Sequence, residues 1–162
     1  MIWEVADTSN QQWTFEKANA HGKYYESKSG DMNCLGYCLF KYEDIGCRRI
    51  DSARVSSDYT QQMINYIKTT HKKNCYQIAS YTAYVPDNMY RMAFRLGAQN
   101  GNKPIDRFHV IHQLSDGRWA GKNSTAGWSK VFANTNPSTT AAMWENDHYP
   151  QSQGTIYFAV EK

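Results

Sequence analysis

The feature that most constrains the fold of this chain is the alternation of apolar and other side chains in its second half. In MYRMAFRLG the apolar side chains fall on every second residue of 90–96, and the same period returns over 108–114. This period of two is typical of strands with one buried face. The turn Ser115-Asp116-Gly117 then reverses the chain into RWAGKN, and TIYFAVEK forms a last strand. The pattern predicts an antiparallel sheet.

Helical spacing precedes the sheet. From Cys34, CLGYCLFKYED repeats apolar residues every three or four positions, with Asp31 or Asn33 as a cap and Gly46 as a stop. A second helix is expected after the capping residues Ser56-Ser57-Asp58, ending at the solvated HKKN. Its predicted buried face holds Tyr59, Met63, Tyr66, Ile67 and Thr70. Helices followed by an antiparallel sheet predict one α+β domain spanning 1–162.

Composition narrows the classes of function. The net charge of +3 is mild and the basic residues are scattered, which argues against a nucleic-acid binder. No apolar run has the length of a membrane span, and the first residues, MIWEVADTSNQQW, do not resemble a signal peptide. We therefore expect export by another route, or a domain cut from a longer protein. The cysteine spacing matches no zinc motif, and a Cys47–Cys75 disulfide stays open.

Cys34 is the candidate nucleophile. It stands where a loop rich in Gly, Asp and Asn passes into the first predicted helix, and a helix N-terminus favours a thiolate. Backbone N–H groups at the same place can hold an oxyanion. Cys38, one turn further in, is expected to be more buried. The alternative is that both are small core residues.

The predicted strand faces sort the histidines. His112 falls on the apolar side of 108–114 and is expected in the core with a satisfied hydrogen bond, whereas His109 falls on the other side, free to face a cleft. The remaining three, His21, His71 and His148, are expected in loops or at a solvated helix end. His109 is therefore the preferred general base.

Asn123 is the candidate partner of that base. A catalytic imidazole needs a group on its second nitrogen to fix its tautomer and orientation. If the loop after 108–114 has three residues or contains a bulge, Asn123 arrives opposite His109. With a two-residue Asp-Gly turn, Ser124 stands there instead.

These segments resemble a known family. GKNSTAGWSK is similar to the asparagine-bearing stretch of papain-type cysteine peptidases, and NCLGYC, HVIHQLSDGRW and GTIYFAV follow the order of motifs in papain-like domains of bacterial toxins and effectors. The resemblance implies a papain-like fold, with N-terminal helices packed on an antiparallel sheet. It implies Cys34 as nucleophile, His109 as base and Asn123 as the orienting residue. It also implies Trp128 as a shield of the His–Asn bond at the substrate side.

The sequence departs from that family in three ways. The family's oxyanion-hole glutamine has no counterpart, because Lys28 stands six residues before Cys34. The Gly-Ser-Cys-Trp context of the family's cysteine is absent too, and if GYCLF is the counterpart of that context, Cys38 is the nucleophile instead. The toxin-type pattern has no asparagine at 123, so Asn134 and Asn136 in FANTNPS remain reserve candidates.

The expected function is a cysteine-dependent amide hydrolase, a protease or deamidase, that acts through a thioester and needs no metal or organic cofactor. The resemblance implies a secreted bacterial toxin or effector, delivered by a specialised secretion system, with a protein, peptide or peptidoglycan substrate and an immunity protein as partner. A peptidoglycan amidase is the alternative within enzymes. An aromatic-rich module that binds carbohydrate or peptide is the alternative of another class, since aromatic residues make up 14% of the chain.

Overall fold

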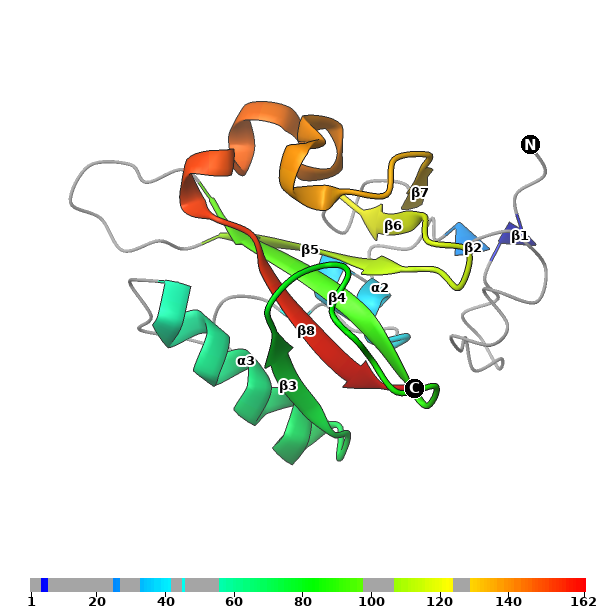
Figure 1. The fold of residues 1–162 in the computed structure, drawn as a ribbon, viewed down its shortest axis with the longest axis vertical. Coiled ribbons are helices and arrows are strands. Elements are labelled where there is room, and N and C mark those ends of the chain that lie inside the picture. Colours follow the sequence, from blue (N-terminus) through cyan, green and yellow to red (C-terminus); the bar gives the residue numbers. More distant parts are fainter. Residues whose placement is uncertain are drawn as a thin grey trace.

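The structure, a computed structural model, describes residues 4–5, 25–26, 33–41, 45, 56–97, 107–123 and 129–162. Its centre is a six-stranded sheet in which every neighbouring pair is antiparallel (Figure 1). The strands are β3 (Cys75–Ile78), β4 (Met89–Leu96), β5 (Phe108–Gln113), β6 (Trp119–Lys122), β7 (Ser129–Phe132) and β8 (Ile156–Glu161), in the order β3-β8-β4-β5-β6-β7. Outside this sheet, β1 (Glu4–Val5) pairs in parallel with β2 (Tyr25–Glu26).

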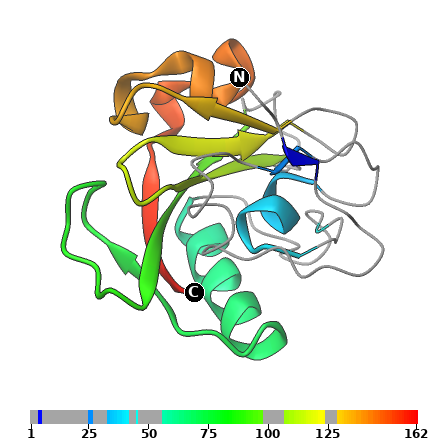
Figure 2. The ribbon, with the colours of Figure 1, turned by 90° about the vertical axis from the view of Figure 1, so that its right-hand side faces the viewer.

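Both α-helices among the described residues lie on one face of the sheet, as the rotated view shows (Figure 2). They are α2 (Cys34–Cys38) and α3 (Ser56–Thr70). Three of the predicted α3 face residues, Tyr59, Met63 and Ile67, are buried against the sheet, whereas Thr70 is exposed. The long helix, the strands at 89–96 and 108–113 and the last strand confirm the expected elements, and the architecture is α+β.

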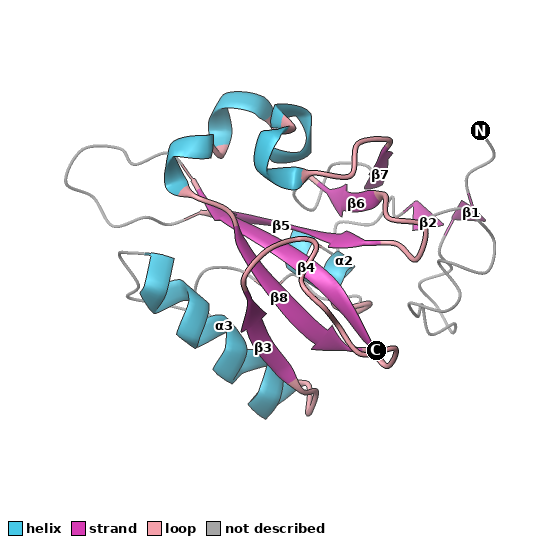
Figure 3. Cartoon of the chain, in the orientation of Figure 1, coloured by secondary structure: helices cyan, strands magenta, loops and turns pink. Residues whose placement is uncertain are grey.

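Four short 3₁₀ helices cover the opposite face (Figure 3). They are η2 (Pro137–Thr139), η3 (Ala141–Trp144), η4 (Asn146–His148) and η5 (Gln151–Gln153). Because this layer exists, β4 is buried on both faces, with Arg91 alone half-buried. The expectation of a half-buried strand at 90–96 was therefore wrong, since alternation reports only the more apolar of two covered faces.

The first helix is shorter than its apolar spacing indicates. It ends at Cys38 and does not reach Gly46, because Phe40 takes a left-handed backbone conformation with φ of 57°. A non-glycine residue in that region stops helical hydrogen bonding.

The structure also bears on the disulfide that the sequence left open. Cys75 is a free, buried thiol and is not paired with Cys47, which lies outside the described residues. Burial raises the pKa of the Cys75 thiol to about 12. In the described part of the chain, no helix is both long enough and apolar enough to cross a membrane.

Asn33 joins the start of α2 to the segment at Ile45, and we expect its loss to destabilise the fold. Its Oδ1 accepts the N–H of Gly36 and of Ile45, each at 3.0 Å, and its Nδ2 donates to the Ile45 carbonyl at 2.6 Å. Asn33→Ala removes a helix cap and leaves buried Ile45 groups unpaired, which lowers the free energy of unfolding by about 1–3 kcal/mol. Urea denaturation measures this loss. Asn65→Ala, at an exposed residue of α3, is the control with an expected change of about 0.5 kcal/mol or less.

Candidate functional site

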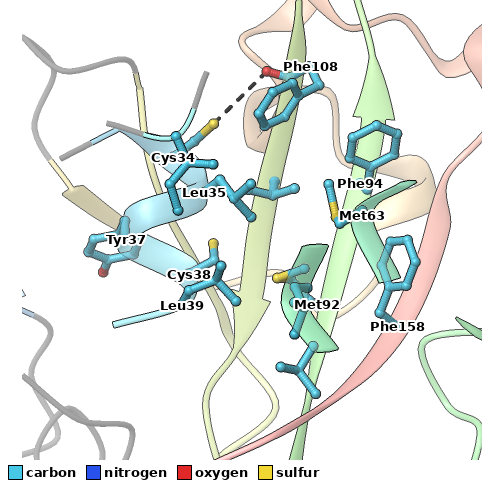
Figure 4. Packing of buried hydrophobic residues seen from close by; sticks show 14 of the residues in the cluster. Cys34, Leu35, Tyr37, Cys38, Leu39, Met63, Met92, Phe94, Phe108 and Phe158 are labelled. Atoms are coloured by element: carbon cyan, nitrogen blue, oxygen red, sulfur yellow. Dashed lines mark hydrogen bonds between the residues drawn. The ribbon is translucent and has the colours of Figure 1, made fainter. Parts of the chain in front are cut away.

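Cys34 is the first residue of α2 and lies against the start of β5. Its side chain is 6% exposed, and its Sγ points to the carbonyl oxygen of Phe108 at 4.0 Å (Figure 4). Cys38, one turn later, is fully buried. Burial and the nearby Cys34 hold the pKa of the Cys38 thiol well above its usual value. Of the two thiols, Cys34 is therefore nearer to solvent and the better candidate nucleophile.

His109 lies in an aromatic pocket on the other side of the sheet. Its ring is 1% exposed, stacks on Tyr149 at 5.2 Å between centroids and meets the edge or face of Trp144 at 5.9 Å. It makes a hydrogen bond to the Met143 backbone, while Nε2 finds no hydrogen-bond partner among the described residues. Burial lowers the pKa of His109 to about 4, against the opposing effect of the Met143 bond. At neutral pH the ring is therefore uncharged.

The structure does not bring the Cys34 thiol and the His109 ring together. Along β5, Phe108 and Val110 belong to the apolar cluster that contains Cys34. The ring of His109 points the opposite way, to Trp144 and Tyr149 in the second cluster. The backbone of the sheet lies between the two groups. His109 does lie on the face of β5 opposite to Phe108 and Val110, as expected. However, its ring is buried and does not face an open cleft.

The β5–β6 loop has the length on which the expected position of Asn123 depends. The Leu114 N–H donates to the Arg118 carbonyl at 2.8 Å, so the loop has three residues, and Gly117 supplies the positive φ of 91° that this loop needs. Ile111 then pairs with Gly121. If this register continued for two residues beyond the last pair, Asn123 would stand opposite His109, but its side chain is exposed whereas the His109 ring is buried.

The reserve asparagines have other positions. Asn136 caps η2, because its Oδ1 accepts the Ser138 N–H at 3.0 Å, and Asn134 is exposed in the segment after β7. Trp128, expected to shield the site, lies outside the described residues. Trp119 is fully buried and donates its Nε1–H to the Thr135 carbonyl, which makes it a core residue.

His112 occupies the face of β5 that carries Cys34. It is fully buried, as expected, with its ring 5.2 Å from Tyr37 and 5.0 Å from Phe40 between centroids. The expectation of a satisfied hydrogen bond was wrong, because neither ring nitrogen has a partner within the described residues. Burial lowers the pKa of His112 to about 3, so it is a neutral ring held by aromatic contacts.

Arg95 is the residue that sequence reasoning missed. It pairs directly with His109 across β4 and β5 and is 2% exposed. Its guanidinium donates to Thr155 Oγ1 at 2.8 Å and lies 4.6 Å from the Trp144 ring centroid, and it also donates to the carbonyls of Tyr149, Pro137 and Ser138 at 3.2, 3.3 and 3.0 Å. Burial lowers its pKa. The sequence does not indicate that Arg95 is buried, because the alternation in 90–96 places it on the face that was expected to be polar.

A shallow cavity of about 390 Å³ opens at the far end of β5, beside the 115–117 loop. Arg91, Gln113 and Asp87 contribute its polar groups, and none of the three predicted catalytic residues lines it. Over the described residues, no group of three or more histidine, cysteine or acidic side chains is placed to hold a metal ion.

Comparisons with protein-family models, with curated proteins and with solved structures find no match to this chain.

Two buried histidines, His109 and His112, make stability depend on pH. Their pKa values in the folded protein, about 4 and about 3, lie below the 6.5 of an exposed ring, so the unfolded chain binds more protons below that pH. We expect the free energy of unfolding to fall as pH drops from 6.5 toward 4, with a limiting slope of about 1.4 kcal/mol per pH unit for each histidine. Above pH 7 they add no pH dependence.

Urea denaturation of the protein at several pH values between 4.5 and 7.5 measures this slope. His109→Phe keeps an aromatic ring but removes the titrating group, so its slope should be about half that of the unaltered protein. His148→Ala, at an exposed histidine, should keep the full slope. An unchanged slope in His109→Phe would show that His109 is not buried as a neutral ring.

Proposed function

We propose that this chain is a cysteine-dependent amide hydrolase of papain-like architecture, with Cys34 as nucleophile, His109 as general base and Asn123 as the residue that orients the imidazole. The observation that supports the proposal is the three-residue loop of the β5–β6 hairpin, because its register, if continued two residues beyond the Ile111–Gly121 pair, would set Asn123 opposite His109. The Cys34 thiol lies near the start of β5, because its Sγ faces the carbonyl of Phe108, the residue that precedes His109 in the sequence.

The chemistry is an acyl transfer in two halves. His109 takes the thiol proton, and the Cys34 thiolate attacks the amide carbon to form a tetrahedral oxyanion beside the backbone N–H of Cys34. Collapse breaks the C–N bond, the imidazolium gives its proton to the leaving nitrogen, and a thioester remains. Water, deprotonated by the same imidazole, then displaces the sulfur and regenerates the thiol.

The proposal requires a local change at the start of β5, so the described arrangement is the resting one. A slip of the whole strand by one residue would turn Val110 and Leu114 out of the core. The described pairing of Phe108 and His109 with β4 is regular, so a β-bulge would have to form at 108–109 to re-aim His109 alone, and bulges are common beside active sites for this reason. Asn123 follows the last residue of β6 and can move with its partner.

The proposed setting, a bacterial toxin or effector delivered into a target cell and restrained by an immunity protein, rests on the sequence resemblance alone. The same residues suit a peptide bond or a side-chain amide, because the catalytic groups do not select the substrate.

A thiol-alkylation experiment tests this function without a known substrate. Intact folded protein is treated with iodoacetamide from pH 5.5 to 9, and modification of each cysteine is followed by peptide mass spectrometry. We expect Cys34 to react well below the pH at which an ordinary thiol ionises, because a histidine partner stabilises the thiolate. His109→Ala should lower the rate at pH 6.5 about tenfold.

His71→Ala is the matched control, since it removes a histidine just beyond the end of α3 that has no role in the proposal. Its Cys34 rate should equal that of the unaltered protein. A Cys34 profile with an ordinary thiol midpoint, identical in His109→Ala, would rule out the hydrolase.

A further inference from the structure

We propose that residues 137–149 form an autoinhibitory strap that keeps the His109 ring in its pocket and so blocks the rearrangement at 108–109 that would bring the ring to Cys34, with Arg95 as its latch. This inference rests on the proposed function. It gives Arg95 and the strap a regulatory role, in addition to their structural role in the 3₁₀ layer.

The strap encloses His109 on several sides. Tyr149 stacks on the ring at an interplanar angle of 29°, and Trp144 meets it at 83°. The Met143 backbone holds the ring by a hydrogen bond. All three contacts come from the strap, so a rearrangement at 108–109 that re-aims the ring is opposed while the strap stays closed.

Arg95 fixes the strap to the sheet at both ends. Its Nη2 donates to the carbonyls of Pro137 and Ser138, and its Nη1 donates to the carbonyl of Tyr149. Within the part of the chain that the structure describes, no carboxylate pairs with this guanidinium. Its buried charge is satisfied by the strap carbonyls, by Thr155 and by the Trp144 ring, so closing the strap and burying Arg95 depend on each other.

The closed strap contains two residues with a strained backbone. Glu145 and Asn146, with φ of 52° and 55°, are consecutive non-glycine residues in the left-handed region. This conformation is disfavoured for an ordinary residue and less so for asparagine. The strained pair lies between Trp144 and Tyr149, the two aromatic residues that touch His109. Loss of the latch therefore favours opening at the place where the ring is held.

The first end of the strap has a second anchor. Ser138 Oγ and Tyr157 OH share a hydrogen bond, and the Trp144 Nε1–H donates to the Pro137 carbonyl at 2.8 Å. An open strap thus keeps its attachment to β8 near residue 138 and moves at its far end, around Tyr149.

The test compares two arginines of the same strand and the same face. Arg95→Met removes the latch but keeps an unbranched apolar stem, whereas Arg91→Met removes a guanidinium that donates to Ala83 and Gln113 and does not touch the strap. Hydrogen–deuterium exchange of residues 137–149 reports opening. Iodoacetamide labelling of Cys34 at pH 6.5 reports release of His109.

We expect Arg95→Met to speed exchange in the strap and to raise the Cys34 labelling rate about tenfold, as a tenfold rise in the competent population would. Arg91→Met should change neither. The double variant Arg95→Met/His109→Ala should lose the rise, which a general loosening of the fold would not do.

The outcomes separate the inference from the function beneath it. If labelling depends on His109 in the unaltered protein but does not rise in Arg95→Met, the strap is not inhibitory and the hydrolase stands. If the strap opens and labelling never depends on His109, the hydrolase fails. Unchanged exchange in a folded Arg95→Met overturns the latch. If circular dichroism shows that Arg95→Met does not fold, Tyr149→Leu, which removes only the stacked ring, takes its place with the same expected results.

Discussion

The structure depends on the alternation of side chains along β5, which lies between two covering layers. Phe108, Val110 and His112 enter the layer of α2 and α3, while His109 and Ile111 enter the 3₁₀ layer. A strand has no third side, so every group on β5 is committed to one layer or the other. This constraint separates the thiol from the imidazole in the described arrangement. It also explains why both histidines are buried and neutral, since neither face of the strand is open to water.

The sequence predicts the elements better than it predicts their surroundings. Alternation and helical spacing locate β4, β5, β8 and α3, because these segments are long enough to show their period. The four-residue strands β3 and β7 show none, and the 3₁₀ helices leave no periodic trace. Without that second layer, the odd positions of β4 read as solvent-facing. The burial of Arg95 was therefore beyond the reach of a pattern that counts only apolar residues.

The candidate site divides along the same line. The register of the β5–β6 hairpin depends on the residues of its turn. Because Ser115-Asp116-Gly117 ends in a glycine, a three-residue loop was among the expected alternatives. The distance between Cys34 and His109 depends instead on which layer covers which face. That choice is made by contacts such as Tyr149 on His109 and Cys34 on Phe108, between residues far apart in sequence. No spacing within a segment encodes it.

Burial and catalysis make opposite demands on His109. A general base near neutral pH needs a pKa close to the working pH and access to a proton donor. Burial in the pocket of Trp144 and Tyr149 lowers the pKa of His109 to about 4, well below neutral pH, and keeps proton donors away from the ring. The ring contributes stability in that pocket only while it is neutral, and in the proposed mechanism it must leave the pocket to act. A hydrolase built in this way is stable and idle with its strap closed. Its activity is then set by the free energy of opening, which Arg95 and the strained residues 145–146 control in opposite directions.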